Sequence, residues 1–288
     1  MKRRFRFFLL WLGGVLLLSS GCSSLSLGYN NLNWLIRWEL DSYFDLTSEQ
    51  EAWLKTQLAA HIEWHRREEL PQYVAFLREI QQRAGDGLTA EEWRGGIVRF
   101  EQGRARLMDR LRPDAAAFLA GLTPQQLGHL REKMEEENQE LAERLQEPRE
   151  KRREERREET LENLEEWFGK LSPEQQTAFG EIYDRTASQE DPTENRLERR
   201  QRTQQEFLAL LEQNPAPEQA SEWLWAWQRG WSQASGSSDW RTRYEERMLA
   251  MDALLTPSQR EHAARKLEGY ALDLEKLIPP DLKRAEFQ

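Results

Sequence analysis

The sequence predicts an all-α fold, an elongated array or bundle of helical hairpins with no β-sheet. Apolar residues recur three, four or seven positions apart, as in the series Trp240, Tyr244, Met248, Met251 and Leu255. No stretch of the sequence shows the sustained alternation of β-branched and polar residues that is typical of a strand. Charged residues make up 32% of the chain and hydrophobic residues 38%, which favours helices with narrow apolar faces.

The first 21 residues have the pattern of a secretory signal peptide. Four basic residues precede an apolar run from Phe7 to Leu18, and small residues follow up to Gly21. Cys22, the one cysteine of the chain, comes directly after them. This segment resembles the lipobox of bacterial lipoproteins, which implies cleavage before Cys22 and lipidation of its thiol and new amine. The alternatives are an ordinary cleaved signal with an incidental cysteine, or an anchor that stays uncut.

The lipobox resemblance also implies a location. Several acyl chains on one residue exceed the two signals that stable membrane attachment requires, so the membrane is an expected partner. In enterobacterial lipoproteins an Asp after the cysteine favours the inner membrane. Ser23 stands there, which implies the periplasmic face of the outer membrane.

The charge balance narrows the classes of partner. The whole chain has 41 basic and 51 acidic residues, and cleavage before Cys22 removes four basic ones, which leaves 37 against 51 and a formal charge of −14. A nucleic-acid binder needs a basic surface to neutralise phosphates, so nucleic acid is not an expected partner. With Cys22 acylated, no thiol remains for a disulfide or a thiolate metal site.

Five segments share the signal of a helix start. In each, a Leu precedes a Thr or Ser that can cap the helix, and a Glu or Gln three residues later can complete a capping box. The leucines are Leu46, Leu88, Leu122, Leu171 and Leu255. Residues 214–219 form a degenerate sixth start. Counted from the leucines and from Gln213, the steps are 42, 34, 49, 42 and 42 residues, which suggests helical hairpin units.

The chain divides into five regions by composition. They are a signal peptide (1–21), a lipidated tether (22–31), an N-terminal helical region (32–142), a charged Glu/Arg connector (143–170) and a C-terminal helical region (171–288). Pro71 predicts a kink or break near Leu70 in a helical stretch over 49–83, and Pro113 predicts the start of a short helix that ends at Gly121. The charged run from Glu143 to Glu159 is either a solvated rod or a contact surface for a partner.

Tryptophans form the most unusual aromatic pattern. Trp223, Trp227 and Trp231 are four residues apart, and Trp225 lies on another face of the same predicted helix. They are candidates for a partner-binding surface, such as a groove for an apolar peptide or acyl chain. The alternative is plain core packing, because tryptophan buries a large area. Trp34 and Trp38 repeat the spacing near the tether, where they can instead rest at a membrane interface.

Two histidines are the remaining candidates for chemistry. His61 and His65 share a helix face, and with Glu68 or Glu69 they could offer three ligands to zinc. The zincin signature requires Glu directly after the first His, where Ile62 stands. The sequence also has no Gly-rich phosphate loop and no nucleophile elbow. We therefore expect no catalytic residue, no metal and no cofactor, with a metal-dependent enzyme as an open alternative.

Residues 41–50, 64–66 and 69–73 resemble an uncharacterised family of proteobacterial lipoproteins, a domain of unknown function. The likeness runs from the lipobox to about Tyr270 and implies helical character and envelope localisation, but no activity. A weaker likeness rests on the Leu-Thr-x-x-Gln motif, found at Leu46, Leu122 and Leu255 and as Leu-Ser-x-x-Gln at Leu171. This motif resembles that of the Spy-like periplasmic chaperones.

These patterns together predict a lipid-anchored, non-enzymatic lipoprotein of the cell envelope. Its expected partners are the membrane, through the anchor, and an unknown protein or envelope component. The alternative is a periplasmic chaperone-like binder of unfolded polypeptides.

Overall fold

The computed structural model describes residues 22–83, 85–187, 194–234 and 238–285. These residues form helices and no strand, which confirms the predicted all-α class. The predicted signal peptide, residues 1–21, lies outside them. The helices of the first half are α1 (Cys22–Asn30), α2 (Leu32–Phe44), α3 (Ser48–Trp64), the π-helical turn η1 (His65–Glu69), α4 (Leu70–Arg83), α5 (Ala90–Ala120) and α6 (Pro124–Leu145). Those of the second half are α7 (Arg149–Phe168), α8 (Pro173–Thr186), α9 (Glu194–Leu211), α10 (Pro217–Ala234), α11 (Ser238–Asp252), α12 (Pro257–Leu277) and α13 (Pro280–Ala285).

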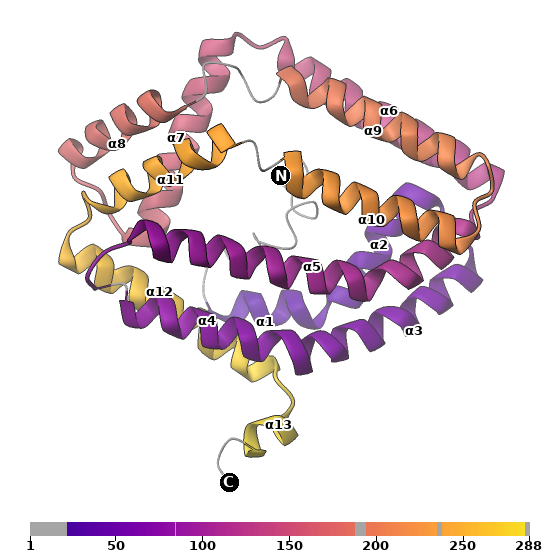
Figure 1. Cartoon of the computed structure of the whole chain (residues 1–288), viewed down its shortest axis with the longest axis horizontal. Helices are drawn as coiled ribbons and strands as arrows, with labels where there is room; N and C mark the ends of the chain where they lie inside the picture. The colour runs from indigo at the N-terminus through magenta and orange to yellow at the C-terminus, as the bar shows by residue number, and fades with distance from the viewer. Residues whose placement is uncertain (1–21, 84, 188–193, 235–237, 286–288) are drawn as a thin grey trace.

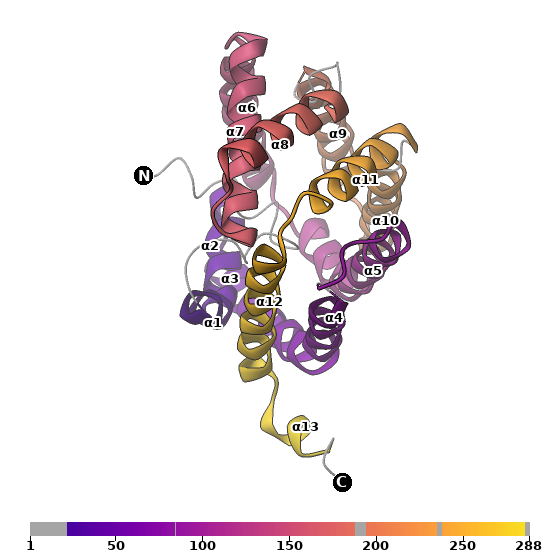
Figure 2. The ribbon, with the colours of Figure 1, turned by 90° about the vertical axis from the view of Figure 1, so that its left-hand side faces the viewer.

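The later helices lie along the earlier ones. Helix α9 packs on α6, α10 on α5, α11 on α8 and α12 on α4 (Figure 1). Helices of the predicted N-terminal region and of the predicted C-terminal region are therefore packed against each other. Figure 2 shows that α1 and α2 lie on one side of the molecule and that α5 and α10 lie on the other.

The core consists of three apolar clusters rather than one. The first joins α2, α3, α5, α6, α9 and α10 around Phe44, Phe118 and Leu130. The second joins α1, α4 and α12 around Leu25, Leu70 and Leu274. The third joins α7, α8 and α11 around Phe179. Several small clusters are what slim helices with narrow apolar faces can build.

All five predicted helix starts carry a complete capping box. The capping hydroxyls belong to Thr47, Thr89, Thr123, Ser172 and Thr256, and each accepts a hydrogen bond from the backbone N–H three residues on. The degenerate sixth start has half a box. Gln219 accepts from the backbone N–H of Ala216 at 2.8 Å, but Ala216 has no hydroxyl to complete the exchange.

The four Gln-containing caps meet in two pairs. Gln126 donates to Gln50 Oε1 at 2.7 Å and Gln50 donates back at 3.2 Å. In the second pair Gln175 donates to Gln259 at 2.8 Å and receives a bond of 3.0 Å in return. Each glutamine thus completes its own cap and links two helix starts that lie 76 or 84 residues apart.

The glutamine pairs give a coupled effect on stability. Gln126→Ala removes half of a capping box and leaves Gln50 without its partner, so we expect a loss of about 1–2 kcal/mol in the free energy of unfolding. The loss in the double variant Gln50→Ala/Gln126→Ala should be smaller than the sum of the two single losses by about 0.5 kcal/mol or more. Urea denaturation followed by circular dichroism measures all three.

A matched control comes from the second pair. Gln175→Ala combined with Gln126→Ala should give additive losses, because the two residues share no partner. Additive losses for Gln50 and Gln126 as well would mean that the reciprocal amide bonds contribute nothing.

The two prolines predicted to interrupt helices have different outcomes. Near Leu70, where a kink or break was predicted, the α-helix is interrupted by the π-helical turn η1, in which the N–H of Leu70 donates to the carbonyl of His65. This wider turn lets the helical path continue from α3 through Pro71 into α4. The short helix predicted to begin at Pro113 is wrong, since Pro113 lies inside the 31-residue helix α5. The rest of a long hydrogen-bond ladder and the burial of Phe118 outweigh one lost backbone bond.

The predicted tether and connector both carry packed residues. Residues 22–30 are helical, and Leu25 is buried in the second cluster. In the charged connector, Arg152 is buried and donates to the carbonyl of Leu145 at 2.8 Å, so it satisfies the last turn of α6. Leu164 further along α7 belongs to the third cluster.

Candidate binding surfaces

Exposed large hydrophobic side chains gather on two helix pairs. Of ten such residues in the described part of the chain, three lie on α1 and α2 and four on α5 and α10. We call the first set the α1–α2 face; it consists of Leu27, Trp34 and Trp38. We call the second set the α5–α10 face; it consists of Val98, Phe100, Trp225 and Trp227, and because residues two apart lie on different sides of a helix, it is spread over both flanks of the pair and is not a single stripe. The two faces lie on opposite sides of the molecule (Figures 1 and 2).

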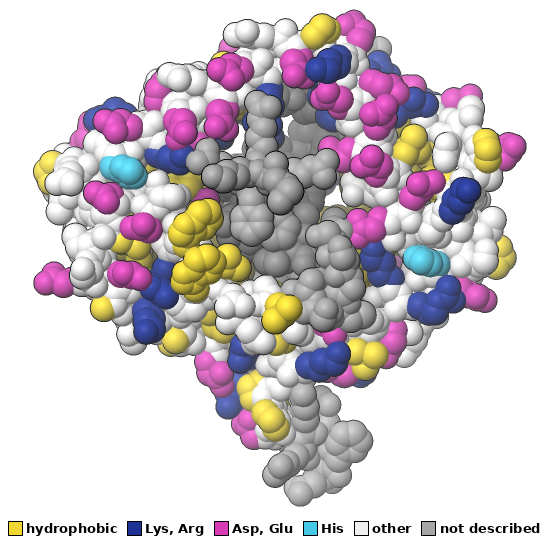
Figure 3. Space-filling view, turned by 180° about the vertical axis from the view of Figure 1, so that it is seen from behind, with side chains coloured by type: hydrophobic (Ala, Val, Ile, Leu, Met, Phe, Trp, Pro, Cys, Tyr) yellow, Lys and Arg dark blue, Asp and Glu magenta, His cyan; other side chains and the backbone are white. Residues whose placement is uncertain are grey.

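The α1–α2 face exists because α2 is amphipathic. Ile36, Leu40 and Tyr43 pack into the first cluster, which turns the opposite side of α2 outward. Trp34 is 56% exposed and Trp38 45%, and their rings stack with centroids 6.3 Å apart at 17°. Seen from behind, hydrophobic side chains gather where α2 lies (Figure 3).

Polar bonds fix α2 against α3. Asn33 donates to the carbonyl of Lys55 at 3.0 Å and accepts from Arg37 Nε at 3.0 Å. Arg37 also forms an ion pair with Glu51. The one charged side chain between Trp34 and Trp38 is thereby drawn toward α3.

The tryptophans of α10 flank its contact with α5. Trp223 is half-buried and packs on Phe207 of α9, with ring centroids 4.8 Å apart. Trp227 continues this side by stacking on Trp223 at 6.3 Å and 9°. Trp225 lies on the other flank, where the guanidinium of Arg229 covers its ring at 4.4 Å. The four candidate residues therefore do not share one groove, and the side chain of Trp231 lies outside the described residues.

The backbone of Cys22 is part of helix α1, and its side chain lies outside the described residues. The sequence does not predict Leu27, Val98 or Phe100 as part of a binding surface. The spacing of seven and four residues from Leu27 to Trp34 and Trp38 carries the signal for Leu27, but residues 22–31 were expected to be a tether.

The two candidate histidines make separate pairs. His61 Nε2 lies 2.7 Å from Asp114 Oδ2 of α5, and His65 Nδ1 lies 2.8 Å from the Tyr29 hydroxyl of α1. Glu69 forms a two-bond ion pair with Arg106 of α5, at 2.7 and 2.9 Å. Within the described ranges no three His, Cys, Asp or Glu side chains gather as a metal site would require.

The cluster around η1 joins four helical segments through polar groups, of which Glu69 is buried and the others are half-buried. Tyr29 comes from α1, His65 and Glu69 from η1, Tyr73 from α4 and Arg106 from α5. Burial is the main reason that the pKa values of Tyr29 and Tyr73 rise to about 12, so both remain hydroxyls at neutral pH. Burial also lowers the pKa of His65, against the opposing charge of Glu69.

Stability should fall on mild acidification because of His65. Its folded pKa lies below the ordinary 6.5, so the unfolded chain takes up the proton first and stability is lost as the pH falls from about 6.5 toward the folded value. Protonated His65 can no longer accept the hydroxyl hydrogen of Tyr29. Between about pH 7 and pH 5, the wild-type chain should therefore lose more unfolding free energy than His65→Gln. Equal losses in urea titrations of the two proteins would contradict this.

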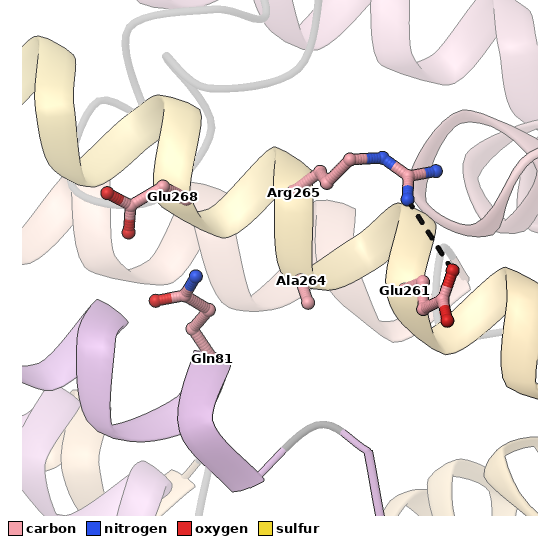
Figure 4. A pocket seen from close by; sticks show the side chains of 5 residues that line it. All are labelled: Gln81, Glu261, Ala264, Arg265 and Glu268. Atoms are coloured by element: carbon pink, nitrogen blue, oxygen red, sulfur yellow. Dashed lines mark ion pairs between the residues drawn. The ribbon is translucent and has the colours of Figure 1, made fainter.

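One shallow depression lies between α4 and α12 and has a volume of about 330 Å³. Gln81, Glu261, Ala264, Arg265 and Glu268 line it. Figure 4 shows Arg265 turned toward Glu261, with 3.7 Å between Nη1 and Oε2. Glu261 and Arg265 are exposed, so water competes for every bond that these side chains could make to a ligand. The depression does not suggest a reaction.

None of the described helices combines the length and the apolar content needed to cross a bilayer. The model of one protein family, a family of unknown function (DUF6279), matches residues 42–234. No curated protein and no solved structure matches the chain.

Proposed function

Because the chain belongs to this family of unknown function, we propose its role from the sequence and the exposed surfaces. We propose that it is a lipid-anchored, non-enzymatic protein of the cell envelope that binds another protein or envelope component through the tryptophans of α10. The observation that carries the binding role is the exposure of two large aromatic side chains, Trp225 at 44% and Trp227 at 38%. Aromatic residues on a surface otherwise rich in charge favour partner binding.

Lipidation of Cys22 would hold the protein at the membrane. The basic and apolar leader that ends at Gly21, directly before the single cysteine, supports this proposal. We further propose the periplasmic face of the outer membrane, on the basis of Ser23. Wild-type protein should incorporate labelled palmitate and fractionate with outer membranes, and Cys22→Ser should do neither.

The polar clusters support a role without catalysis. His61 and His65, the candidates for chemistry, each bind a partner from a different helix. A catalytic base needs access to a substrate, whereas His61 is buried and His65 is enclosed by Tyr29 and Tyr73. Each of the two histidines links two helical elements, which suits a structural role.

Site-specific photo-crosslinking tests the binding surface. A photoreactive amino acid placed at Trp225 or Trp227 in the lipidated chain should yield a specific crosslinked protein in intact cells. The same amino acid at Leu272, an exposed leucine of α12, serves as the matched control. If the products at 225 and 227 equal those at 272, the proposed binding surface is wrong.

The α5–α10 face also favours a second candidate, the chaperone-like binding of unfolded polypeptides. Val98 and Phe100 are each 50% exposed on α5, so apolar contacts are spread over two packed helices rather than confined to one pocket. Such a surface suits segments of varied sequence. Suppression of client aggregation in light scattering, lost in Trp225→Ala/Trp227→Ala, would support this candidate, and no suppression at several-fold excess would exclude it.

A further inference from the structure

We propose that the α1–α2 face, formed by Leu27, Trp34 and Trp38, rests in the interfacial layer of a lipid bilayer and fixes the orientation of the protein body. This inference rests on the proposed anchoring at Cys22 and deepens it. A lipid on Cys22 alone would hold the protein near the membrane but leave its orientation free. Contact of the α1–α2 face with the bilayer would fix that orientation.

Between Leu27 and Trp38 no exposed residue is charged, and the cation nearest to Asn30 is the half-buried Arg66 of η1, which donates to Asn30 at 2.9 Å. The exposed residues from Leu27 to Trp38 are Leu27, Asn30, Asn31, Trp34 and Trp38. In the sequence, the uncharged run extends from Phe7 to Ile36, in a chain of which 32% is charged. Exposed acidic residues return only at Asp41 and Asp45, at the end of α2 farthest from Cys22. Along α1 and α2, exposed charged residues therefore appear only at the end farthest from the anchor.

The geometry suits a helix pair that lies flat on a bilayer. Trp34 and Trp38 are four residues apart on one side of α2, and Leu27 is exposed on α1, across the turn at Asn31. At 1.5 Å per residue, Leu27 lies about 8 Å along α1 from Cys22. Indole rings are favoured at the level of the lipid headgroups, because one end is apolar and the N–H can meet water.

The position of the anchor favours a bilayer over a protein as occupant. A globular partner on Leu27 would have to fit between the body and a membrane about 8 Å away along the helix. With Cys22 lipidated as proposed, lipid would occupy that space. On the opposite side of the molecule, the α5–α10 face would then point into the aqueous compartment, where a partner can reach it (Figure 2).

A depth measurement tests the docking. The full lipidated chain carries Leu27→Cys labelled with an environment-sensitive fluorophore, in vesicles of phosphatidylethanolamine and phosphatidylglycerol with or without brominated acyl chains. The probe at 27 should emit at shorter wavelength and lose most of its intensity in brominated vesicles. The same probe at Val98→Cys, exposed on α5, should show neither effect.

Two double variants test whether Trp34 and Trp38 keep the α1–α2 face in the bilayer interface. Trp34→Ser/Trp38→Ser should remove the quenching at position 27 while the protein still sediments with vesicles. Trp225→Ser/Trp227→Ser is the matched control and should leave the quenching unchanged. All four tryptophans are exposed, so the fold should tolerate both pairs.

Thiol labelling of the chain without added cysteines separates the two proposals. If this chain takes up no label and binds vesicles, but the probe at 27 behaves like the probe at 98, anchoring stands and docking is overturned. If Cys22 takes up one equivalent of label and the protein stays in the supernatant with both probes in water, both proposals are overturned.

Discussion

Arg106→Met should lower the free energy of unfolding by about 3 kcal/mol. Its partner Glu69 is only 1% exposed, and two charge-assisted bonds of 2.7 and 2.9 Å join the side chains. Without the guanidinium, a buried carboxylate keeps its desolvation cost and loses its main compensation. Because the Arg106 side chain is itself 41% exposed, water can reach part of the site, and we expect the low end of the usual range of about 3–5 kcal/mol.

The double variant Glu69→Met/Arg106→Met is the informative comparison. It removes both charges while keeping similar volumes, so most of the lost stability should return. Urea denaturation followed by circular dichroism measures the single and double variants. A single variant that loses less than about 1 kcal/mol would show that the buried carboxylate needs no cation.

Phe179→Ala should cost about 3–5 kcal/mol. Phe179 is fully buried at the centre of the third cluster, with Leu164, Leu171 and Met251 among its members. Truncation removes its apolar burial and leaves a cavity, because neighbouring helices relax only in part. Since α7, α8 and α11 all meet there, the loss should appear as a lower thermal midpoint of the whole chain or of this part.

Phe100→Ala is the matched control for Phe179→Ala. The same ring is deleted, but Phe100 is 50% exposed, so the loss should stay near or below about 1 kcal/mol. Similar losses in both variants would mean that the third cluster is not a packed core.

Local signals in the sequence were sufficient for the helix starts. A Thr or Ser with Gln or Glu three residues later satisfies backbone donors within one turn, so the capping boxes follow from adjacent residues. That Gln50 would meet Gln126, and Gln175 would meet Gln259, depends on contacts 76 and 84 residues apart. No local pattern encodes that pairing.

Two predictions were wrong, a helix start at Pro113 and an unstructured tether over residues 22–31, and long-range contacts explain both. Pro113 lowers helix propensity locally, but the packing of α5 along α10 keeps the helix continuous. Residues 22–30 look like a small polar linker in sequence, yet Leu25 reaches the cluster around α12 and Tyr29 reaches His65. Tertiary contacts decide both segments.

The candidate site was predictable only in part. The periodicity separated Trp225 from Trp223 and Trp227, and the structure places them on two flanks of α10. Whether these rings would be covered depended on α5 and α9, which the sequence does not place. The partners of His61 and His65, Asp114 and Tyr29, likewise come from other helices.

The packing of late helices on early ones has a consequence for biogenesis. A ribosome delivers α4, α5 and α6 before α9, α10 and α12, which cover them, have been made. During synthesis, the apolar faces of α4, α5 and α6 are therefore exposed until the later helices have been made, and such a state is prone to aggregation. A truncation after α8 should produce inclusion bodies rather than a smaller stable protein.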